Sequence, residues 1–177
     1  MKYFTNNFLN FPSCNNPTDY LEISIKMASL HSTLFEHSNN HLSQKSMYYY
    51  LQNDKIHVFC NKISIAIIQV SGIEADLITI GIDPNKQGKG VGSKLLELLS
   101  LYLKELNVQN LFLEVACNNI AAIKTYTTIG FKPCGIRKNY YPKINDIESD
   151  ASVMVCNLSR KNGKLDKKKL QRLYPTG

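Results

Sequence analysis

The stretch GIDPNKQGKGVGSKLLELL, residues 81–99, decides the fold because it places three glycines between an apolar run and a leucine-rich segment. Gly88, Gly90 and Gly92 lack the Cβ atoms that would block a ligand, so the backbone N–H groups of the following helical turn stay open. Anions are favoured at a helix N-terminus, and three lysines add positive charge nearby: Lys86, Lys89 and Lys94. The stretch predicts a cradle for a pyrophosphate, although a tight turn with close helix packing also explains the glycines.

Two common nucleotide-binding motifs do not fit this loop. A P-loop requires GxxxxGK[ST], which no segment of the chain matches. A dinucleotide fingerprint requires GxGxxG and an acidic residue about 20 positions later at the end of a second parallel strand. The glycines here run GxGxG instead. Neither motif therefore explains the loop.

The segments around the loop predict the nearest helices and strands. Residues 74–82 are typical of a strand, and residues 91–106 predict an amphipathic helix with an apolar face of Val91, Leu95, Leu98, Leu99, Tyr102 and Leu106. Toward the N-terminus, a first helix is expected at about 18–35, with apolar residues at helical spacing: Leu21, Ile25, Ala28 and Leu30. A second helix is expected at about 42–52.

The remaining segments predict a hairpin and the C-terminal half of a sheet. Residues 56–60 and 63–70 are expected to pair as antiparallel strands joined by an Asn61-Lys62 turn. Further along, we expect a buried strand at 110–115, a helix ended by Gly130, and a last strand at 150–158. The order of elements is ααβββαβαββ.

The size and composition are those of a soluble globular protein. A chain of 177 residues fits one domain, and its 44% hydrophobic and 20% charged residues are ordinary for such a domain. No apolar stretch approaches the roughly 20 residues that span a bilayer, and the N-terminus lacks the apolar core of a secretory signal. We expect a cytoplasmic monomer that does not associate with membranes.

The cysteines and histidines give no indication of a disulfide framework or a metal site. The five cysteines are scattered and never spaced as CxxC, and the four histidines form no ligand pattern: Cys14, Cys60, Cys117, Cys134 and Cys156; His31, His37, His41 and His57. We expect free thiols and no metal.

The positive charge is concentrated near the C-terminus. The formal net charge is +7, and residues 160–172 hold seven basic residues and one acidic residue. Such a run can contact RNA weakly through phosphates, but it is more often a solvated terminus. A non-enzymatic protein that binds ribosomal RNA through this run therefore stays open as an alternative.

The loop and the segment after it resemble a known family. Gln87-Gly88-Lys89-Gly90-Val91-Gly92 matches the [QR]xxGx[GA] signature of the GCN5-related N-acetyltransferases (GNAT). The segment LFLEVACNNIAAIKTYTTIGFKPCGIRKNYYP, residues 111–142, resembles the RimI-like ribosomal-protein-alanine N-acetyltransferase subfamily. The resemblance is good over about 74–158. It implies a GNAT domain at 18–158, between an N-terminal extension at 1–17 and a basic tail at 159–177.

The resemblance implies an α/β fold (α+β in some schemes) and acetyl-CoA as the cosubstrate. In this fold a mixed, mostly antiparallel sheet is flanked by helices, and its middle strands, here 74–82 and 110–115, splay apart to admit acetyl-CoA. The backbone of Ile80 and Ile82 would pair with the pantetheine arm, with a bulge near Gly81. The pyrophosphate would bind to Gln87, Gly88, Lys89, Gly90, Val91, Gly92 and Ser93. Asn119 would hydrogen-bond the cofactor arm, although its position also suits a helix N-cap.

The resemblance also implies the catalytic residues. Glu114 matches the base that accepts a proton from the amine, and Tyr126 matches the acid that protonates the departing sulfur. From the residues alone, Glu114 could be a solvent-facing strand residue and Tyr126 a core tyrosine. Direct transfer in a ternary complex is expected, and an acyl intermediate on Cys117 or Cys134 is a minor alternative.

The acceptor is expected to be the N-terminus of a protein, and a ribosomal protein is the acceptor that the subfamily implies. Arg137, Asn139, Tyr140 and Tyr141 match the late loop that walls the peptide site in the family. The Phe-Pro-Trp segment usual in the subfamily is absent, because the chain has no Trp and carries FEHSNNHLS at 35–43, and Ala116 replaces a common Arg. A lysine side chain or a small-molecule amine therefore stays open as the acceptor.

Overall fold

The computed structural model describes residues 17–36, 41–144 and 147–159. Its elements follow the order ααβββαβαββ, with one 3₁₀ turn added after the third strand. The strands form one sheet in the order β1-β2-β3-β4-β6-β5. Within the described residues, no helix is long and apolar enough to cross a membrane. The expected order of elements is confirmed.

The described residues divide into two compact units, which we treat separately. The first comprises the described residues up to Gln69 together with Thr79–Lys89, and the second comprises Val70–Ile78 together with the described residues from Gly90 onward. The expected extension at 1–17 and the basic tail at 159–177 lie almost wholly outside the described residues. The domain bounds given above therefore stay a prediction.

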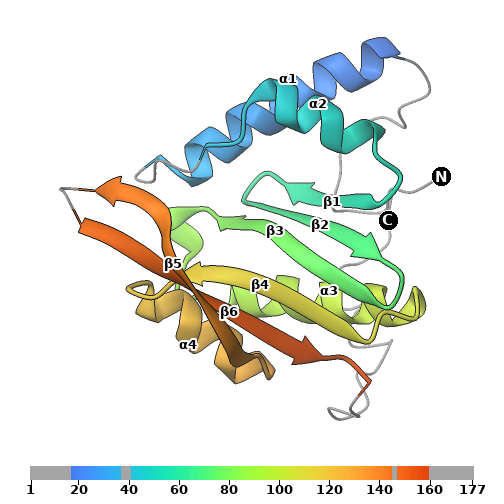
Figure 1. The fold of residues 1–177 in the computed structure, drawn as a ribbon. Helices are drawn as coiled ribbons and strands as arrows, with labels where there is room; N and C mark the ends of the chain where they lie inside the picture. Colours follow the sequence, from blue (N-terminus) through green and yellow to red (C-terminus); the bar gives the residue numbers. More distant parts are fainter. Residues whose placement is uncertain (1–16, 37–40, 145–146, 160–177) are drawn as a thin grey trace. The chain divides into compact units, whose positions relative to one another are not determined.

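In the first unit, two helices and a hairpin surround an apolar core. Helices α1 (Pro17–Leu34) and α2 (Gln44–Gln52) lie side by side next to the hairpin of β1 (Ile56–Asn61) and β2 (Ser64–Ser71) (Figure 1). The core consists of apolar side chains from all four elements, among them Ile23, Met27, Met47, Leu51, Phe59, Ile65 and Ile67. Ser43 caps α2 by accepting a hydrogen bond from the Ser46 amide.

The hairpin turn is shifted by one residue from its expected position. Asn61 ends β1 opposite Ser64, so the two loop residues are Lys62 and Ile63. The Asn61 side chain accepts hydrogen bonds from the Ile63 amide (2.9 Å) and the Ser64 hydroxyl (3.0 Å). Asparagine often organises the turn that follows it in this way, and the bonds keep Asn61 in the strand.

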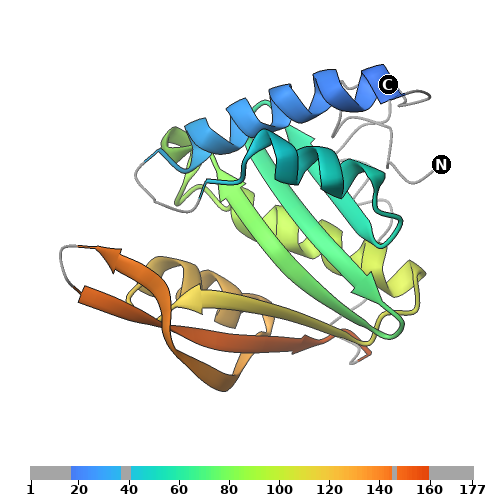
Figure 2. The same cartoon turned by 45° about the horizontal axis from the view of Figure 1, so that its top comes forward.

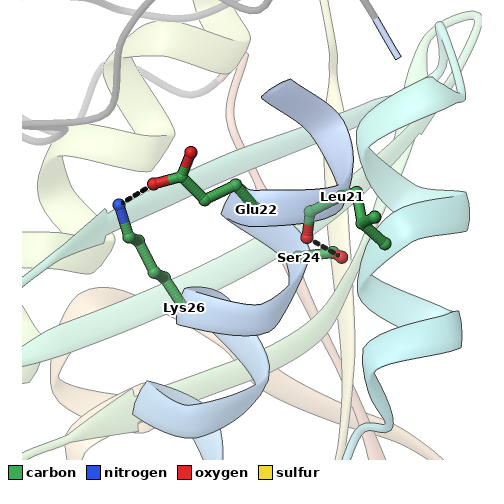
Figure 3. Close-up of polar contacts among 4 residues, drawn as sticks. All are labelled: Leu21, Glu22, Ser24 and Lys26. Carbon is green, nitrogen blue, oxygen red and sulfur yellow. Dashed lines mark hydrogen bonds and ion pairs between the residues drawn. The ribbon is translucent and has the colours of Figure 1, made fainter. Parts of the chain in front are cut away.

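The buried face of α1 is not the expected one. Leu21 and Ile25 are 48% and 51% exposed, whereas the buried residues are Ile23, Ser24, Met27, His31 and Leu34. Figure 3 shows the Ser24 hydroxyl donating to the Leu21 carbonyl (2.7 Å) and the ion pair between Glu22 and Lys26 (2.5 Å) on this helix. The buried stripe has helical spacing but includes two polar side chains whose hydrogen bonds are satisfied. The prediction of the buried face from hydrophobicity alone was therefore wrong.

Gly81 lies against the end of α1. Strand β3 spans Glu74–Ile82, as expected residue for residue. A Cβ atom on Gly81 would lie 2.5 Å from Cε2 of Phe35 and 3.3 Å from Cγ2 of Ile65. The aromatic ring thus occupies the space that a side chain would need, and it explains the glycine without a ligand. The bulge expected near Gly81 stays a prediction.

In the second unit, two helices pack next to strands from the C-terminal half of the chain. Helices α3 (Val91–Glu105) and α4 (Ile120–Ile129) contact each other and lie on the same side of strand β4 (Asn110–Ala116) (Figures 1 and 2). β4 pairs with the antiparallel strand β6 (Ile147–Asn157), which pairs with β5 (Lys132–Ile144). Gly130 ends α4 in the left-handed conformation (φ 109°), as expected.

The helix after the glycine loop buries a face that was predicted only in part. Leu95 and Leu99 are buried as expected, but Leu96 and Leu103 complete the buried face and Leu106 is 39% exposed. Leu106 follows the last helical residue and therefore leaves the spacing of the helix. The core of this unit also contains Leu111, Phe131 and Met154.

Candidate active site

The glycine loop is held by bonds within its own backbone and side chains. Asp83 accepts a hydrogen bond from the Asn85 amide (2.8 Å) at the start of the 3₁₀ turn Pro84–Lys86. Gln87 donates from Nε2 to the Ile82 carbonyl (3.1 Å), and Lys89 donates from Nζ to the Asn85 carbonyl (3.1 Å). Gln87 and Lys89 therefore stabilise the conformation of the loop through bonds that require no ligand.

Two glycines of the loop have backbone conformations that other residues rarely adopt. Gly88 and Gly90 have φ angles of 69° and 77°, and no atom lies within 4 Å of a Cβ built on either residue. A positive φ is far more costly for any residue with a Cβ. Glycine is therefore required at both positions by the path of the backbone, and the space beside each residue is open.

The N-terminus of α3 presents backbone donors. Gly90 occupies the N-cap position, no side chain of the described residues caps the helix, and the Lys94 amide makes the first helical bond to the Gly90 carbonyl (3.0 Å). The amides of Val91, Gly92 and Ser93 precede that bond and have no helical carbonyl to reach. An anion at this end would be stabilised by these donors and by the helix dipole.

Strands β3 and β4 pair over only part of their lengths. The parallel ladder joins Glu74 to Asn110 and ends with Leu77 opposite Leu113. β3 continues to Ile82 and β4 continues to Ala116. The residue of β4 that follows the last pair is Glu114. The expected parting of the two strands stays a prediction.

Glu114 is the centre of a polar and aromatic cluster. Its Oε1 atom lies 2.5 Å from Nη1 of Arg137 in an ion pair, and its carbonyl accepts a hydrogen bond from the Tyr141 hydroxyl (3.4 Å). A side-chain hydrogen bond to Glu114 raises the pKa of Tyr140. The Arg137 guanidinium lies over the Tyr140 ring, 4.2 Å from its centroid. The structure thus brings together Glu114, Arg137, Tyr140 and Tyr141.

A bulge in β5 allows two residues of that strand, Arg137 and Tyr140, to reach the Glu114 carboxylate. Arg137 pairs with Ala151 and Tyr141 with Ser149, so four steps along β5 match two steps along β6. Asn139, in the middle, has a left-handed φ of 52°. Residues of a regular strand alternate between faces, so Arg137 and Tyr140 would otherwise face opposite sides. The extra residues place both beside Glu114.

Asp150 anchors this bulge and was not predicted as a site residue. Its carboxylate accepts hydrogen bonds from the Asn139 amide (3.0 Å) and the Lys138 ammonium (2.8 Å), and these bonds lower the pKa of Asp150. Its carbonyl accepts a bond from the Cys117 amide (2.9 Å). The Asn139 amide is thus engaged by Asp150. No sequence signal connects Asp150 to the loop eleven residues before it.

A second acidic residue near Glu114 was also missed. Burial, followed by repulsion from Glu74 and Glu114, raises the pKa of Asp76 on β3. Asp76 pairs with Phe112, two residues before Glu114, so the two acids share a face of neighbouring strands. Alternation along β3 could have indicated this position.

Tyr126 is buried in the core of the second unit. Its side chain is 8% exposed, and its ring lies 5.7 Å from the Phe131 ring, measured between centroids. Burial, with a smaller effect of Tyr141, raises the pKa of Tyr126 to about 12. The hydroxyl is therefore protonated at neutral pH, as a proton donor must be. Its position as a core tyrosine is confirmed, and its role as an acid stays a prediction.

Asn119 caps the helix α4. Its Oδ1 atom accepts a hydrogen bond from the Ala122 amide (3.1 Å). The prediction that Asn119 is a helix N-cap is therefore confirmed, and a contact with a cofactor stays a prediction.

The described cysteines are free thiols, as expected: Cys60, Cys117, Cys134 and Cys156. Burial raises the pKa of Cys60 to about 12, which makes its thiol unreactive. Cys14 lies outside the described residues, and no metal-ligand cluster occurs among the residues that are described.

The predicted site residues are divided between the two units. Ile80, Gly81, Ile82 and Gln87–Lys89 belong to the first unit. The second contains Gly90–Ser93, Glu114, Asn119, Tyr126 and the Arg137–Tyr141 segment.

Comparison with known proteins agrees with the family signature. The model of the acetyltransferase (GNAT) family matches residues 26–131. The [ribosomal protein bS18]-alanine N-acetyltransferase of Escherichia coli K12 is 42% identical over 108 residues, which are 61% of this chain and 68% of that relative. The Haemophilus influenzae enzyme of the same name is 47% identical over 96 residues, 54% of this chain and 65% of that relative.

A solved structure extends the similarity to the fold. The crystal structure of the ribosomal-protein-S18-alanine N-acetyltransferase from Escherichia coli matches with a TM-score of 0.69 and 31% identity, over 87% of this chain and 97% of that one. The match to the family model covers more than half of the 177 residues. The glycine loop, the ααβββαβαββ order and these similarities lead to one conclusion: the chain belongs to the acetyltransferase (GNAT) family of N-acetyltransferases.

Proposed function

We propose that this protein transfers an acetyl group from acetyl-CoA to the N-terminal α-amine of a protein, by direct attack in a ternary complex. The observation that carries the proposal is the position of Glu114, an acid in an otherwise apolar strand, directly after the end of the β3–β4 ladder. The similarity to relatives named as acting on an N-terminal alanine of ribosomal protein bS18 supports this acceptor class.

Members of the GNAT family use acetyl-CoA, and the glycine loop suits its pyrophosphate. The uncapped start of α3 offers three backbone donors, Val91, Gly92 and Ser93, and the side of Gly88 and Gly90 is open. The backbone of Ile80 and Ile82 would hold the pantetheine arm as a strand partner, and Asn119 would bind its amides. Gln87 and Lys89 would support the loop through the bonds that they make within it.

Glu114 and Tyr126 supply the proton transfers. An α-amine has a pKa near 8 and is mostly protonated at neutral pH, so it must lose a proton before attack. Glu114 accepts that proton, and Tyr126 donates one to the sulfur when the C–S bond breaks. Tyr140 and Tyr141 hold the acceptor peptide, and the closeness of amine and thioester supplies much of the acceleration.

Acetyl-CoA should stabilise the protein, and the glycine loop should account for much of the effect. At 100 times its dissociation constant, acetyl-CoA should add about 2.7 kcal/mol to the free energy of unfolding, measured as a rise in Tm. Gly90→Ala should lose most of this rise, because a Cβ is disfavoured at φ 77° and the loop must change its path.

Gly72→Ala is the matched control for the loop variant. Gly72 also has a positive φ (63°) and nothing within 4 Å of its Cβ, but it lies in the turn before β3. It should lose the same backbone stability and keep the whole response to acetyl-CoA. Equal responses from both variants would exclude the loop as the binding site.

The acceptor class can be tested with peptides. An Ala-starting peptide should be acetylated more efficiently than an N-blocked peptide with an internal lysine, because a side-chain amine with a pKa near 10.4 is far harder to deprotonate. Turnover is measured by mass spectrometry of the peptides. Mass spectrometry of ribosomal proteins from cells with and without this protein then identifies the natural acceptor, because that protein lacks its acetyl group in the cells without the enzyme. Faster turnover of the lysine peptide would contradict the proposal.

A further inference from the structure

Arg137 lies where a substrate cation would be expected. In the described structure its guanidinium is paired with Glu114 at 2.5 Å and lies over the face of Tyr140 at 4.2 Å. A carboxylate beside an aromatic face is a favourable site for any cation, including an α-ammonium group. The cation that occupies this site here belongs to the protein itself.

We propose that Arg137 is an internal competitor of the acceptor, which leaves Glu114 when the substrate ammonium arrives and returns when the neutral amide is formed. This inference rests on the function proposed above. It assigns Arg137 to the gating of the acceptor site, in place of a contact that holds the peptide.

The exposure of the pair makes such an exchange inexpensive. The Arg137 side chain is 55% exposed, whereas the Glu114 side chain is 28% exposed. The guanidinium can move into water without losing much solvation, and ion pairs of this kind contribute little to stability. The Glu114 carboxylate is partly enclosed and would be destabilised without a partner. A substrate ammonium ion that takes the place of Arg137 keeps it paired.

The charge change of the reaction gives the exchange a direction. The acceptor enters as an ammonium ion and loses one proton to Glu114. Its nitrogen then forms the N–C bond as the C–S bond breaks, Tyr126 protonates the sulfur, and the second proton that leaves the nitrogen restores Tyr126. The product is an uncharged amide. A cation competes with Arg137 for a carboxylate, but an amide does not. Once Glu114 has passed its proton to water, the ion pair with Arg137 forms again and favours product release.

Substitution of Arg137 gives opposite results for a competitor and for a peptide contact. Arg137→Gln should lower the KM of an Ala-starting peptide about threefold, the range expected for loss of an exposed ion pair. The acetylated peptide should also inhibit at a correspondingly lower concentration. Arg137→Lys should return KM toward the value of the unmodified protein, because it restores the cation. Lys132→Gln removes the same charge from β5 outside the cluster and should leave KM unchanged.

A raised or unchanged KM in Arg137→Gln, with the unmodified protein active, would overturn the inference but not the proposed function. An inactive unmodified protein would overturn the proposed function instead. A measurement without turnover then decides the inference: alaninamide is added to the full chain and the Arg137 guanidinium resonance is followed by NMR. We expect it to shift toward the position of free arginine, whereas N-acetylalaninamide should have no effect. No shift with alaninamide would contradict the exchange.

Discussion

Glu114→Gln should lower kcat for an Ala-starting peptide by about 10²–10⁴-fold, the usual contribution of a positioned proton acceptor. Glutamine has the same shape and can still accept hydrogen bonds from Arg137 and Tyr140, but it cannot take a proton from the amine. The affinity for acetyl-CoA should change little, because the predicted diphosphate contacts lie at the start of α3. Steady-state kinetics and calorimetry measure the two quantities.

The control for this variant is Glu74→Gln. Glu74 is an exposed acid at the start of β3, opposite Asn110, in the same unit. The same chemical change there should leave kcat within about twofold of the unmodified protein, as expected of a surface substitution. If Glu114→Gln retained full kcat, Glu114 would not be the base, and Asp76, the acid on the same face of β3, would become the candidate.

Acidification should destabilise the protein through one histidine in the first unit. His31 is almost fully buried, stacked on Phe35 with 4.2 Å between ring centroids. Its Nδ1 atom accepts a hydrogen bond from the Leu42 amide (3.4 Å), so Nε2 carries the proton that is shared with the Thr79 hydroxyl (3.2 Å). Burial, and then repulsion from His41, lowers the pKa of His31 to about 4.

The direction of the effect follows from proton binding. The unfolded chain takes up a proton at the usual pKa of 6.5, whereas the folded protein does so only near 4. The free energy of unfolding should therefore be highest above pH 6.5, fall by about 3 kcal/mol as the pH drops to 4, and level off below that value. Urea unfolding between pH 4 and 7.5 measures this slope.

Two variants identify the source of the slope. His31→Gln should make the free energy of unfolding less dependent on pH over this range, whatever its absolute stability. His41→Gln should keep most of the slope, because burial is the larger cause of the lowered pKa. An unchanged slope in His31→Gln would assign the acid sensitivity to other groups.

Most of the elements could be predicted from local patterns. The strand Glu74–Ile82 was expected residue for residue, and the start of α3 and the end of α4 at Gly130 followed from glycines that the backbone requires. These features depend on neighbours in the chain, where spacing and backbone conformation act directly. The family, too, could be recognised from the order of short motifs.

Which face each helix buries was harder to predict. The stripe of α1 that includes Ser24 and His31 is buried because each polar group finds a partner: the Leu21 carbonyl for Ser24, and Thr79 and Leu42 for His31. Apolar spacing favoured the opposite side, with Leu21 and Ile25, which are exposed. A buried hydrogen bond offsets the cost of burying a polar side chain, and hydrophobicity does not report such bonds.

The sequence by itself determined the order of helices and strands, the glycine loop and the identity of Glu114 as the acid in β4, because these depend on residue type and local spacing. Only the tertiary structure decided that Arg137, Tyr140 and Tyr141 meet at Glu114. That meeting depends on the β5 bulge at Asn139 and on its anchor, Asp150, which joins residues distant in the chain. The strand register, and with it the direction in which each side chain points, is set by pairing between strands and has no local signature.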